Sequence, residues 1–187
     1  MKILVIDNYD SFVYNLVYML KSFSAVEVTV VKNNQFEMGN VNQYDKILLS
    51  PGPGIPKDAG LMTALIKAYA ATKSILGVCL GHQAIAEVFG ASLYNLPEPL
   101  HGIASTIHLT SEDDLFFNVP TTFKVGHYHS WVVRNTTQTT IEIIAEDQHK
   151  NIMALKHKEF DVKGVQFHPE SILTEYGYQI IKNWIEK

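Results

Sequence analysis

Cys79 is the residue whose type and surroundings best suit covalent chemistry. It is the single cysteine among 187 residues, and it stands in the sequence Gly-Val-Cys-Leu-Gly, residues 77–81, after an apolar run. A lone cysteine is usually a small core residue, but glycines two positions to either side indicate a nucleophile elbow, a strand-to-helix turn without room for a Cβ. The first turn of a helix favours thiolate over thiol, and the Leu80 N–H there can bind an oxyanion. The sequence therefore predicts a nucleophilic thiol.

A thiolate in this role needs a proton carrier, and His168 is the candidate. It stands in the sequence Gln-Phe-His-Pro-Glu, residues 166–170, after the last predicted strand. His168 and Glu170 are two residues apart in a near-extended segment, so their side chains point the same way, and Pro169 stiffens the link between them. The carboxylate can then orient the imidazole and stabilise its cation. Without the cysteine the pair would as easily be two surface residues; with it, the sequence predicts a Cys79, His168, Glu170 triad.

A rigid loop rich in glycine and proline follows another predicted strand. Its sequence is Ser-Pro-Gly-Pro-Gly-Ile-Pro, residues 50–56, which exposes backbone N–H groups and carries little side chain. If this loop lies beside the elbow at the same sheet edge, Gly52 can supply a second oxyanion donor. No Gly-Lys-Ser/Thr follows, so the loop is not a phosphate loop, although its composition is also typical of an ordinary turn.

Metal binding is the alternative chemistry that acidic and histidine residues could support. Asp7 and Asp10 follow the first predicted strand, where acids can bind Mg²⁺ or cap a helix, and we favour the cap. His127 and His129 point the same way along a predicted strand, but no third ligand stands at a convincing spacing. We therefore expect no metal site.

The composition narrows the possible partners. With 47% hydrophobic and 18% charged residues, the chain suits one globular domain over residues 1–187. A formal net charge of −4 and a pI near 6.0 give no basic field for nucleic acid or anionic lipid. The opening apolar run, residues 3–6, is too short for a signal peptide or a membrane span. A free thiol fits a reducing compartment, so we expect a cytoplasmic protein that binds neither nucleic acid nor a membrane.

The elements that must position these residues alternate between strand and helix in the first half of the chain. Apolar, β-branched runs predict buried strands, and helical spacing of apolar residues predicts the helices between them. The predicted strands are residues 3–6, 26–31, 46–49 and 75–78, and the predicted helices are residues 12–23 with Ser11 as N-cap, 61–71, and 80–89 ended by Gly90. Repeated strand-helix-strand units imply a parallel sheet with helices on both faces and a site beyond the carboxyl ends of its strands.

The pattern changes in the second half. From about residue 92 to 155 it breaks into short strand-like pieces, residues 106–109, 131–133 and 141–145, which predict an antiparallel addition. One more strand, residues 163–167, and an amphipathic helix, residues 175–185, close the chain. The predicted class is α/β: an open, mostly parallel sheet of flavodoxin-like form with helices on both faces and a small antiparallel addition.

The three motifs, in this order and spacing, resemble those of the class I, or triad, glutamine amidotransferases over the whole chain. The sequences Asp-Asn-Tyr-Asp-Ser-Phe at residues 7–12 and His-Tyr-His-Ser at residues 127–130 narrow the resemblance to the glutaminase subunits, component II, of anthranilate synthase and 4-amino-4-deoxychorismate synthase. This resemblance implies that Cys79 attacks the side-chain amide of L-glutamine, forms a γ-glutamyl thioester and releases ammonia. His168 would protonate the ammonia and then activate water. The ammonia would pass to a chorismate-binding synthase subunit, component I, which would hold Mg²⁺, while this chain needs no cofactor.

The resemblance also assigns roles to further residues. Backbone N–H groups of Gly52 and Leu80 would bind the oxyanion. Substrate contacts would come from Gly52, Pro53, Gly54, Gln83, Ser130 and Trp131, and contacts to the partner subunit from Asp10, Ser11, His101 and Gly102. Two residues depart from the family pattern: His127 stands where arginine is usual, and Ile103 stands where lysine is usual. Both departures concern contact with the partner and leave the triad intact.

Two other functions remain open at the level of sequence. A free-standing cysteine peptidase or γ-glutamyl hydrolase would use the same three residues. A non-enzymatic flavodoxin-like binding module would share the fold, but it leaves both the elbow and the His168–Glu170 pair unexplained. The choice between anthranilate and aminodeoxychorismate as product belongs to the partner subunit.

Overall fold

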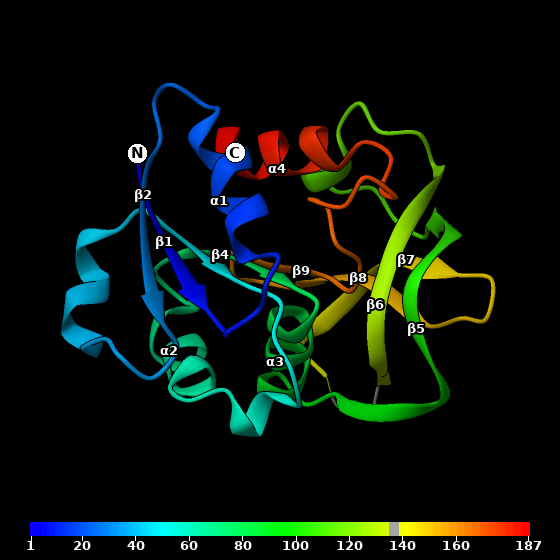
Figure 1. Cartoon of the computed structure of the whole chain (residues 1–187), viewed down its shortest axis with the longest axis horizontal. Coiled ribbons are helices and arrows are strands. Elements are labelled where there is room, and N and C mark those ends of the chain that lie inside the picture. Colours follow the sequence, from blue (N-terminus) through cyan, green and yellow to red (C-terminus); the bar gives the residue numbers. More distant parts are fainter. Residues whose placement is uncertain (135–138) are drawn as a thin grey trace.

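The computed structural model describes residues 1–134 and 139–187. Within this part of the chain, nine strands form one sheet in the order β2-β1-β3-β4-β9-β8-β7-β5-β6 (Figure 1). The strands are β1 (Lys2–Asp7), β2 (Glu27–Lys32), β3 (Lys46–Leu49), β4 (Ser74–Val78), β5 (Ser92–Leu109), β6 (Thr122–Arg134), β7 (Ile141–Asp147), β8 (Ile152–His157) and β9 (Val162–Val165). The α-helices are α1 (Val13–Lys21), α2 (Met62–Tyr69), α3 (Leu80–Val88) and α4 (Gly177–Glu186), and three short 3₁₀ helices are η1 (Met38–Gln43), η2 (Pro56–Asp58) and η3 (Asp114–Phe116).

The parallel part of the sheet has helices on both faces, as the sequence predicts. Strands β2, β1, β3, β4 and β9 all run parallel. In Figure 1, α1 and α4 lie above this part and α2 and α3 below it. Successive residues of β1 alternate between the two cores: Ile3 belongs to the core between the sheet and helices α1 and α4, and Leu4 to the core between the sheet and helices α2 and α3. This double burial explains why these strands have continuous apolar sequences.

The antiparallel part is more extended than predicted. The short pieces around residues 106–109 and 131–133 belong to strands of 18 and 13 residues. β5 pairs with β6 from residue 92 to 108, with register shifts between Asn95 and Leu100 and between His101 and Ile103, but with β7 only over residues 107–109. Because most of β5 is exposed, its sequence lacks the apolar alternation that marks a half-buried strand.

Two local predictions were wrong. Ser11 does not cap α1, which begins at Val13 without a side-chain cap; instead, Asp10 Oδ1 accepts a hydrogen bond from the Phe12 N–H at 2.7 Å. The Asp10 carboxylate thus closes the turn that precedes the helix. β2 is an edge strand with partly exposed residues rather than a buried one.

In the described residues, no helix combines the length and apolarity needed to cross a membrane.

Candidate active site

Cys79 joins β4 to α3 in a strained turn. Its φ is +52° and its ψ is −101°, a conformation that non-glycine residues rarely adopt and that is often found at functional sites. The turn leaves no space beside it: a Cβ on Gly77 would lie 2.4 Å from the Gly81 carbonyl carbon, and a Cβ on Gly81 would lie 2.5 Å from the Leu49 carbonyl oxygen. The predicted tight turn and its need for both glycines are therefore confirmed, and Cys79 stands at the carboxyl end of β4.

The neighbouring strand β9 leads to the predicted base. β4 and β9 pair in parallel with Val78 opposite Val165, and the Cys79 N–H donates to the Val165 carbonyl at 2.9 Å. Both strands therefore end at the same sheet edge. The residue after Val165, Gln166, directs its Nε2 toward the Cys79 sulfur at 3.7 Å. The sequence motif contains Gln166, but sequence reasoning assigned it no role.

His168 and Glu170 form the predicted pair. His168 Nδ1 lies 2.7 Å from Glu170 Oε1, and the two side chains are 2% and 0% exposed. The backbone around His168 is fixed as well, because its N–H donates to the Gly126 carbonyl at 3.2 Å and its carbonyl accepts from Thr174 Oγ1 at 2.6 Å. The two residues are therefore a preorganised imidazole and carboxylate, not a solvated surface pair.

The surroundings of His168 favour its cation. Burial alone lowers the pKa of His168, but contacts with Cys79 and then with Glu170 outweigh burial and raise it to about 10. His168 Nε2 is buried without a hydrogen-bond partner of standard geometry, which leaves it able to exchange a proton with the thiol. A thiolate beside an imidazolium is the activated form of a cysteine nucleophile.

Two aromatic rings cover His168. The Tyr128 ring centroid lies 4.9 Å from that of His168 and the Phe12 centroid 5.9 Å, both edge-on, and the two aromatic rings lie 5.3 Å from each other. Tyr128 is also held by a 3.1 Å contact between its hydroxyl and Ser171 Oγ. Rings in these positions shield the imidazole from water and strengthen its interaction with the carboxylate.

The loop of residues 50–56 lies against the elbow, as predicted. A Cβ on Gly52 would lie 2.7 Å from Leu80 Cδ2 and 2.5 Å from Asn8 Cβ. Asn8 fixes the loop, because its N–H donates to Ser50 Oγ at 2.9 Å and its side-chain amide donates to the Ser50 carbonyl at 2.8 Å. Sequence reasoning assigned no role to this buried asparagine, although it stands in the motif of residues 7–12.

The predicted substrate residues come from this loop, from α3 and from β6. Gln83 Nε2 donates to the Trp131 carbonyl at 2.9 Å and to Gln166 Oε1 at 3.2 Å. This hydrogen bond brings Gln83 and Trp131 together beside the elbow. Pro53 lines a cavity of about 210 Å³ together with Asn8 and Leu80. Gly54 has a φ of +76° with open space around it, and Ser130 precedes Trp131 on β6.

The residues predicted to face a partner lie near the aromatic cover. The His101 ring on β5 packs edge-on against Tyr128 at 5.3 Å, and Tyr128 also contacts Phe12, next to Ser11. His101 and Ser11 are exposed, and Gly102 turns the strand at a φ of +69° with open space where a Cβ would lie. The two predicted segments thus approach the same rings.

His127 and His129 are not arranged as metal ligands. His127 Nδ1 lies 3.0 Å from His129 Nε2, so the two rings hydrogen-bond to each other. Among residues 1–134 and 139–187, no three His, Cys, Asp or Glu side chains are grouped so that they could hold a metal ion. His82, directly after the elbow helix begins, is fully buried, and burial lowers its pKa to about 4.

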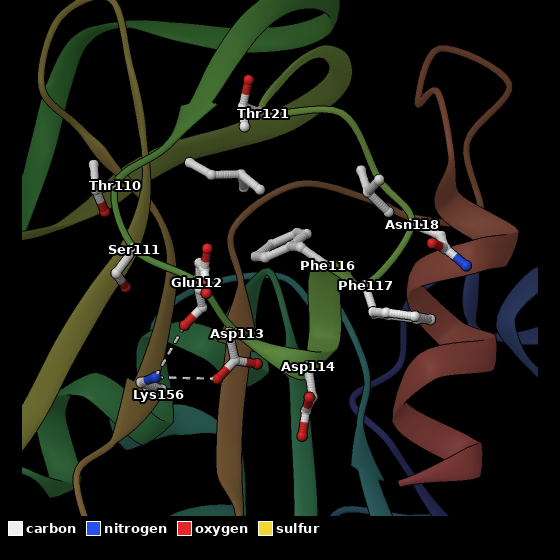
Figure 2. Close-up of a pocket in the computed structure, with 12 residues that line it drawn as sticks. Thr110, Ser111, Glu112, Asp113, Asp114, Phe116, Phe117, Asn118, Thr121 and Lys156 are labelled. Atoms are coloured by element: carbon white, nitrogen blue, oxygen red, sulfur yellow. Dashed lines mark hydrogen bonds and ion pairs between the residues drawn. The ribbon is translucent and has the colours of Figure 1, made fainter.

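A cavity larger than the one beside Pro53 lies away from this site. It has a volume of about 740 Å³ and lies between β5, η3 and β8 (Figure 2). Its charged groups neutralise one another: Lys156 Nζ lies 3.3 Å from one Asp113 oxygen, and Lys163 Nζ lies 2.8 Å from the other. Figure 2 also shows the hydrogen bond that Lys156 Nζ donates to the backbone carbonyl of Glu112. The described residues that line this cavity include neither cysteine nor histidine, so the candidate active site is the one around Cys79.

Comparison with known proteins identifies the family of the chain. The family model of class I glutamine amidotransferases matches residues 4–187. The chain therefore belongs to the class I glutamine amidotransferase family.

Individual relatives narrow the group. Anthranilate synthase component 2 of Lactococcus lactis is 42% identical over 189 residues, covering 99% of this chain and 94% of the relative. Aminodeoxychorismate synthase component 2 of Klebsiella aerogenes is 39% identical over 188 residues, covering 99% and 100%. A crystal structure from Thermoplasma acidophilum, provisionally named as one of the subunits of GMP synthase, superposes with a TM-score of 0.89 at 25% identity, covering 100% of this chain and 92% of that one.

Proposed function

We propose that the chain is the glutaminase subunit of a chorismate-using synthase. Its residues 1–187 would act as a single amidotransferase domain that hydrolyses L-glutamine and delivers ammonia to a component I subunit. The observation that carries this proposal is the position of Cys79 on a strained turn beside the 2.7 Å His168–Glu170 pair. The similarity to component 2 of both anthranilate synthase and aminodeoxychorismate synthase supports the choice of partner.

The first half of the reaction forms a thioester. The Cys79 thiolate attacks the Cδ carbonyl carbon of glutamine, and the negative charge that develops on oxygen is stabilised by the Gly52 and Leu80 N–H groups. His168 then gives its proton to the amide nitrogen, so that the C–N bond breaks and ammonia leaves. Glu170 holds the imidazole orientation throughout.

The second half releases glutamate. His168, now neutral, takes a proton from water, and the resulting hydroxide attacks the thioester carbon. The C–S bond breaks, the thiolate of Cys79 returns, and the imidazolium is restored for the next cycle. Substrate orientation would come from Gly52, Pro53, Gly54, Gln83, Ser130 and Trp131.

The partner would receive the ammonia at the face formed by Asp10, Ser11, His101 and Gly102. This chain would need no cofactor, and Mg²⁺ would belong to the partner. A nucleophilic thiol must stay reduced, which supports a cytoplasmic location. Whether the partner makes anthranilate, aminodeoxychorismate or both depends on the partner's own site.

The test is the Cys79→Ala variant in the complex reconstituted with component I from the same cell. We expect glutamine-dependent synthesis to be abolished and ammonia-dependent synthesis to be retained, because only the first requires the thiol. Product formation measured with glutamine and with ammonium salt distinguishes the two activities.

A matched control is Ser92→Ala, an exposed position on β5, which should retain both activities. Undiminished use of glutamine by the Cys79→Ala variant would contradict the proposal. Efficient hydrolysis of γ-glutamyl peptides by the wild-type chain alone, with no activation by component I, would instead assign it to a free-standing hydrolase.

A further inference from the structure

A continuous chain of hydrogen bonds runs through the antiparallel ribbon to the candidate site. Ser105 Oγ on β5 lies 2.6 Å from His127 Nε2 on β6. His127 Nδ1 lies 3.0 Å from His129 Nε2, and His129 Nδ1 lies 3.0 Å from the Trp131 carbonyl oxygen. His127 and His129 are only 0% and 7% exposed. Four groups from two strands are thus joined end to end.

The last acceptor sets the direction of the chain. A backbone carbonyl can only accept, so His129 must carry its proton on Nδ1. In a neutral ring, His129 Nε2 is then an acceptor, and His127 must donate to it from Nδ1. His127 Nε2 is in turn an acceptor, and the Ser105 hydroxyl must donate to it. Every donor therefore points from β5 toward Trp131, and both imidazoles hold the same tautomer.

The surroundings keep both rings neutral. Burial lowers the pKa of His127 to about 4, although the Asp147 carboxylate on β7 raises it in part and His168 lowers it further. Burial lowers the pKa of His129 to about 3, with further lowering by His127, His168 and then His82 on α3. The Trp131 carbonyl, which accepts from His129, opposes this shift.

Beyond Trp131, the chain reaches the sulfur. The Trp131 carbonyl also accepts from Gln83 Nε2 at 2.9 Å, and Gln83 Nε2 contacts Gln166 Oε1 at 3.2 Å. Gln166 Nε2 in turn points to the Cys79 sulfur at 3.7 Å. The Trp131 carbonyl therefore accepts hydrogen bonds from both His129 and Gln83, and Gln83 also contacts Gln166, whose amide faces the sulfur.

We propose that Ser105, His127 and His129 form a one-directional hydrogen-bond chain that fixes the Trp131 carbonyl and, through it, Gln83 beside Cys79. His127 and His129 are positioning residues for substrate binding and exchange no proton with the substrate. This inference rests on the proposed glutaminase function for its kinetic consequence, but not for the chain itself.

The chain itself is tested on the wild-type full-length protein by ¹⁵N NMR of the imidazole nitrogens. Both rings should show the Nδ1–H tautomer and remain uncharged from pH 8 down to about pH 5, since their pKa values lie near 4 and 3. The Nε2–H tautomer in either ring, or protonation of either ring above about pH 6, close to the ordinary value, overturns the proposal.

The positioning role is tested by two substitutions at the same residue. His127→Phe keeps a ring but removes both hydrogen bonds and leaves His129 Nε2 unpaired. His127→Asn places an amide N–H near the former Nδ1 and can still donate to His129. The probe is a diazoketone analogue of glutamine that alkylates Cys79. Its half-saturating concentration reports binding, and its limiting rate reports thiol reactivity.

For His127→Phe we expect the half-saturating concentration to rise about tenfold, the size typical of a buried group left unpaired, with the limiting rate unchanged. His127→Asn should lie near wild type. The matched controls are His108→Phe and His108→Asn on β5, where the histidine is 40% exposed, and neither should alter either value. Equal effects of His127→Asn and His127→Phe, or an effect on the limiting rate alone, would refute the positioning role.

The two proposals fail in distinguishable ways. If the wild-type chain in complex with component I is not alkylated at Cys79 by the glutamine analogue, the glutaminase proposal fails, while the tautomer measurement still decides whether the hydrogen-bond chain exists. If His127→Phe does not fold, which thermal unfolding would show, the proposal is decided by His127→Asn and by the tautomers of the wild type.

Discussion

Two buried pairs that contain histidine lie within the same site. The imidazole of one pair is charged, and the imidazoles of the other are neutral. His168 faces the Glu170 carboxylate at 2.7 Å, and its pKa is raised to about 10. His127 faces His129 at 3.0 Å, and burial lowers the pKa of these two residues to about 4 and about 3. All four side chains are almost inaccessible to water.

The difference shows that the partner, not burial, decides the charge of a buried imidazole. Burial disfavours the cation in both pairs, and at His168 the contacts with Cys79 and then with the Glu170 carboxylate outweigh that cost. Each pair uses its charge state: the His168 cation can supply a proton to a leaving group, while the neutral His127 and His129 can each donate and accept in a fixed direction. The same site therefore contains a histidine that can donate a proton, His168, and two neutral histidines, His127 and His129, that can hold neighbouring groups in place.

The largest expected effect comes from removing the carboxylate. Glu170→Gln keeps the shape but not the charge, so the pKa of His168 should fall below about 10, although the contact with Cys79 still raises it. We expect glutaminase activity to fall by about a hundredfold or more, the usual contribution of general acid-base catalysis. Steady-state kinetics of the complex and NMR titration of His168 measure the two effects.

The matched control is Glu159→Gln, an exposed carboxylate that should leave both quantities unchanged. Full activity of Glu170→Gln together with a charged His168 would contradict the role of the Glu170 carboxylate in keeping this imidazole charged.

A carboxylate can also be added to the neutral pair. Ser105→Asp places an acid opposite His127 Nε2, which now accepts from the serine hydroxyl at 2.6 Å. The pKa of His127 should rise by about 1–3 units, the usual effect of an adjacent opposite charge, while His127 Nδ1 still donates to His129. NMR titration of His127 measures the shift, with Ser92→Asp on the same strand as the control. An unchanged pKa would show that factors other than the partner set the charge.

The smallest expected effect is on stability in acid. The folded-state pKa values of His127 and His129 lie below the ordinary value, so these residues stabilise the fold above pH 6.5 and lose that contribution as the pH falls through 6.5 toward 4. Each imidazole contributes a slope of at most about 1.4 kcal/mol per pH unit. In His127→Asn, the free energy of unfolding should therefore fall less steeply between pH 6.5 and 4, which urea unfolding at several pH values measures.

His168 has the opposite linkage. Its raised pKa stabilises the fold fully below pH 6.5, and this contribution is lost as the pH rises through about 10.

A His127→Asn variant that lost acid stability as steeply as wild type would contradict the neutral state assigned to His127.

The parallel half of the fold and the elbow could be predicted from sequence because local rules decide them. Strand Lys46–Leu49 was predicted to the residue, since a strand buried on both faces is a continuous apolar run. The elbow was predicted because glycine is required where the backbones at Gly77 and Gly81 touch. His168 and Glu170 were paired because two residues apart means the same side of an extended chain.

The rest depends on contacts that no local pattern contains. β5 has few buried residues over its 18 positions, so periodicity gives no sign of its length. The turn before α1 is closed by Asp10 and not by Ser11, and both residue types are common at such turns. The link from Ser105 to His127 joins two strands at 22 residues' separation, and its direction depends on a carbonyl further along β6. Side-chain networks of this kind require the fold before they can be read.

The parallel pairing of β4 with β9 has a consequence for how the protein is made. Cys79 leaves the ribosome long before His168, because 88 residues separate them in the sequence. Domains form from the N-terminus onward during synthesis, and a parallel pair with so long a crossover closes late. Until Val165 takes its place beside Val78, the thiol has neither its base nor its carboxylate. During synthesis the thiol therefore lacks its base, and the triad is assembled only after β9 has paired with β4.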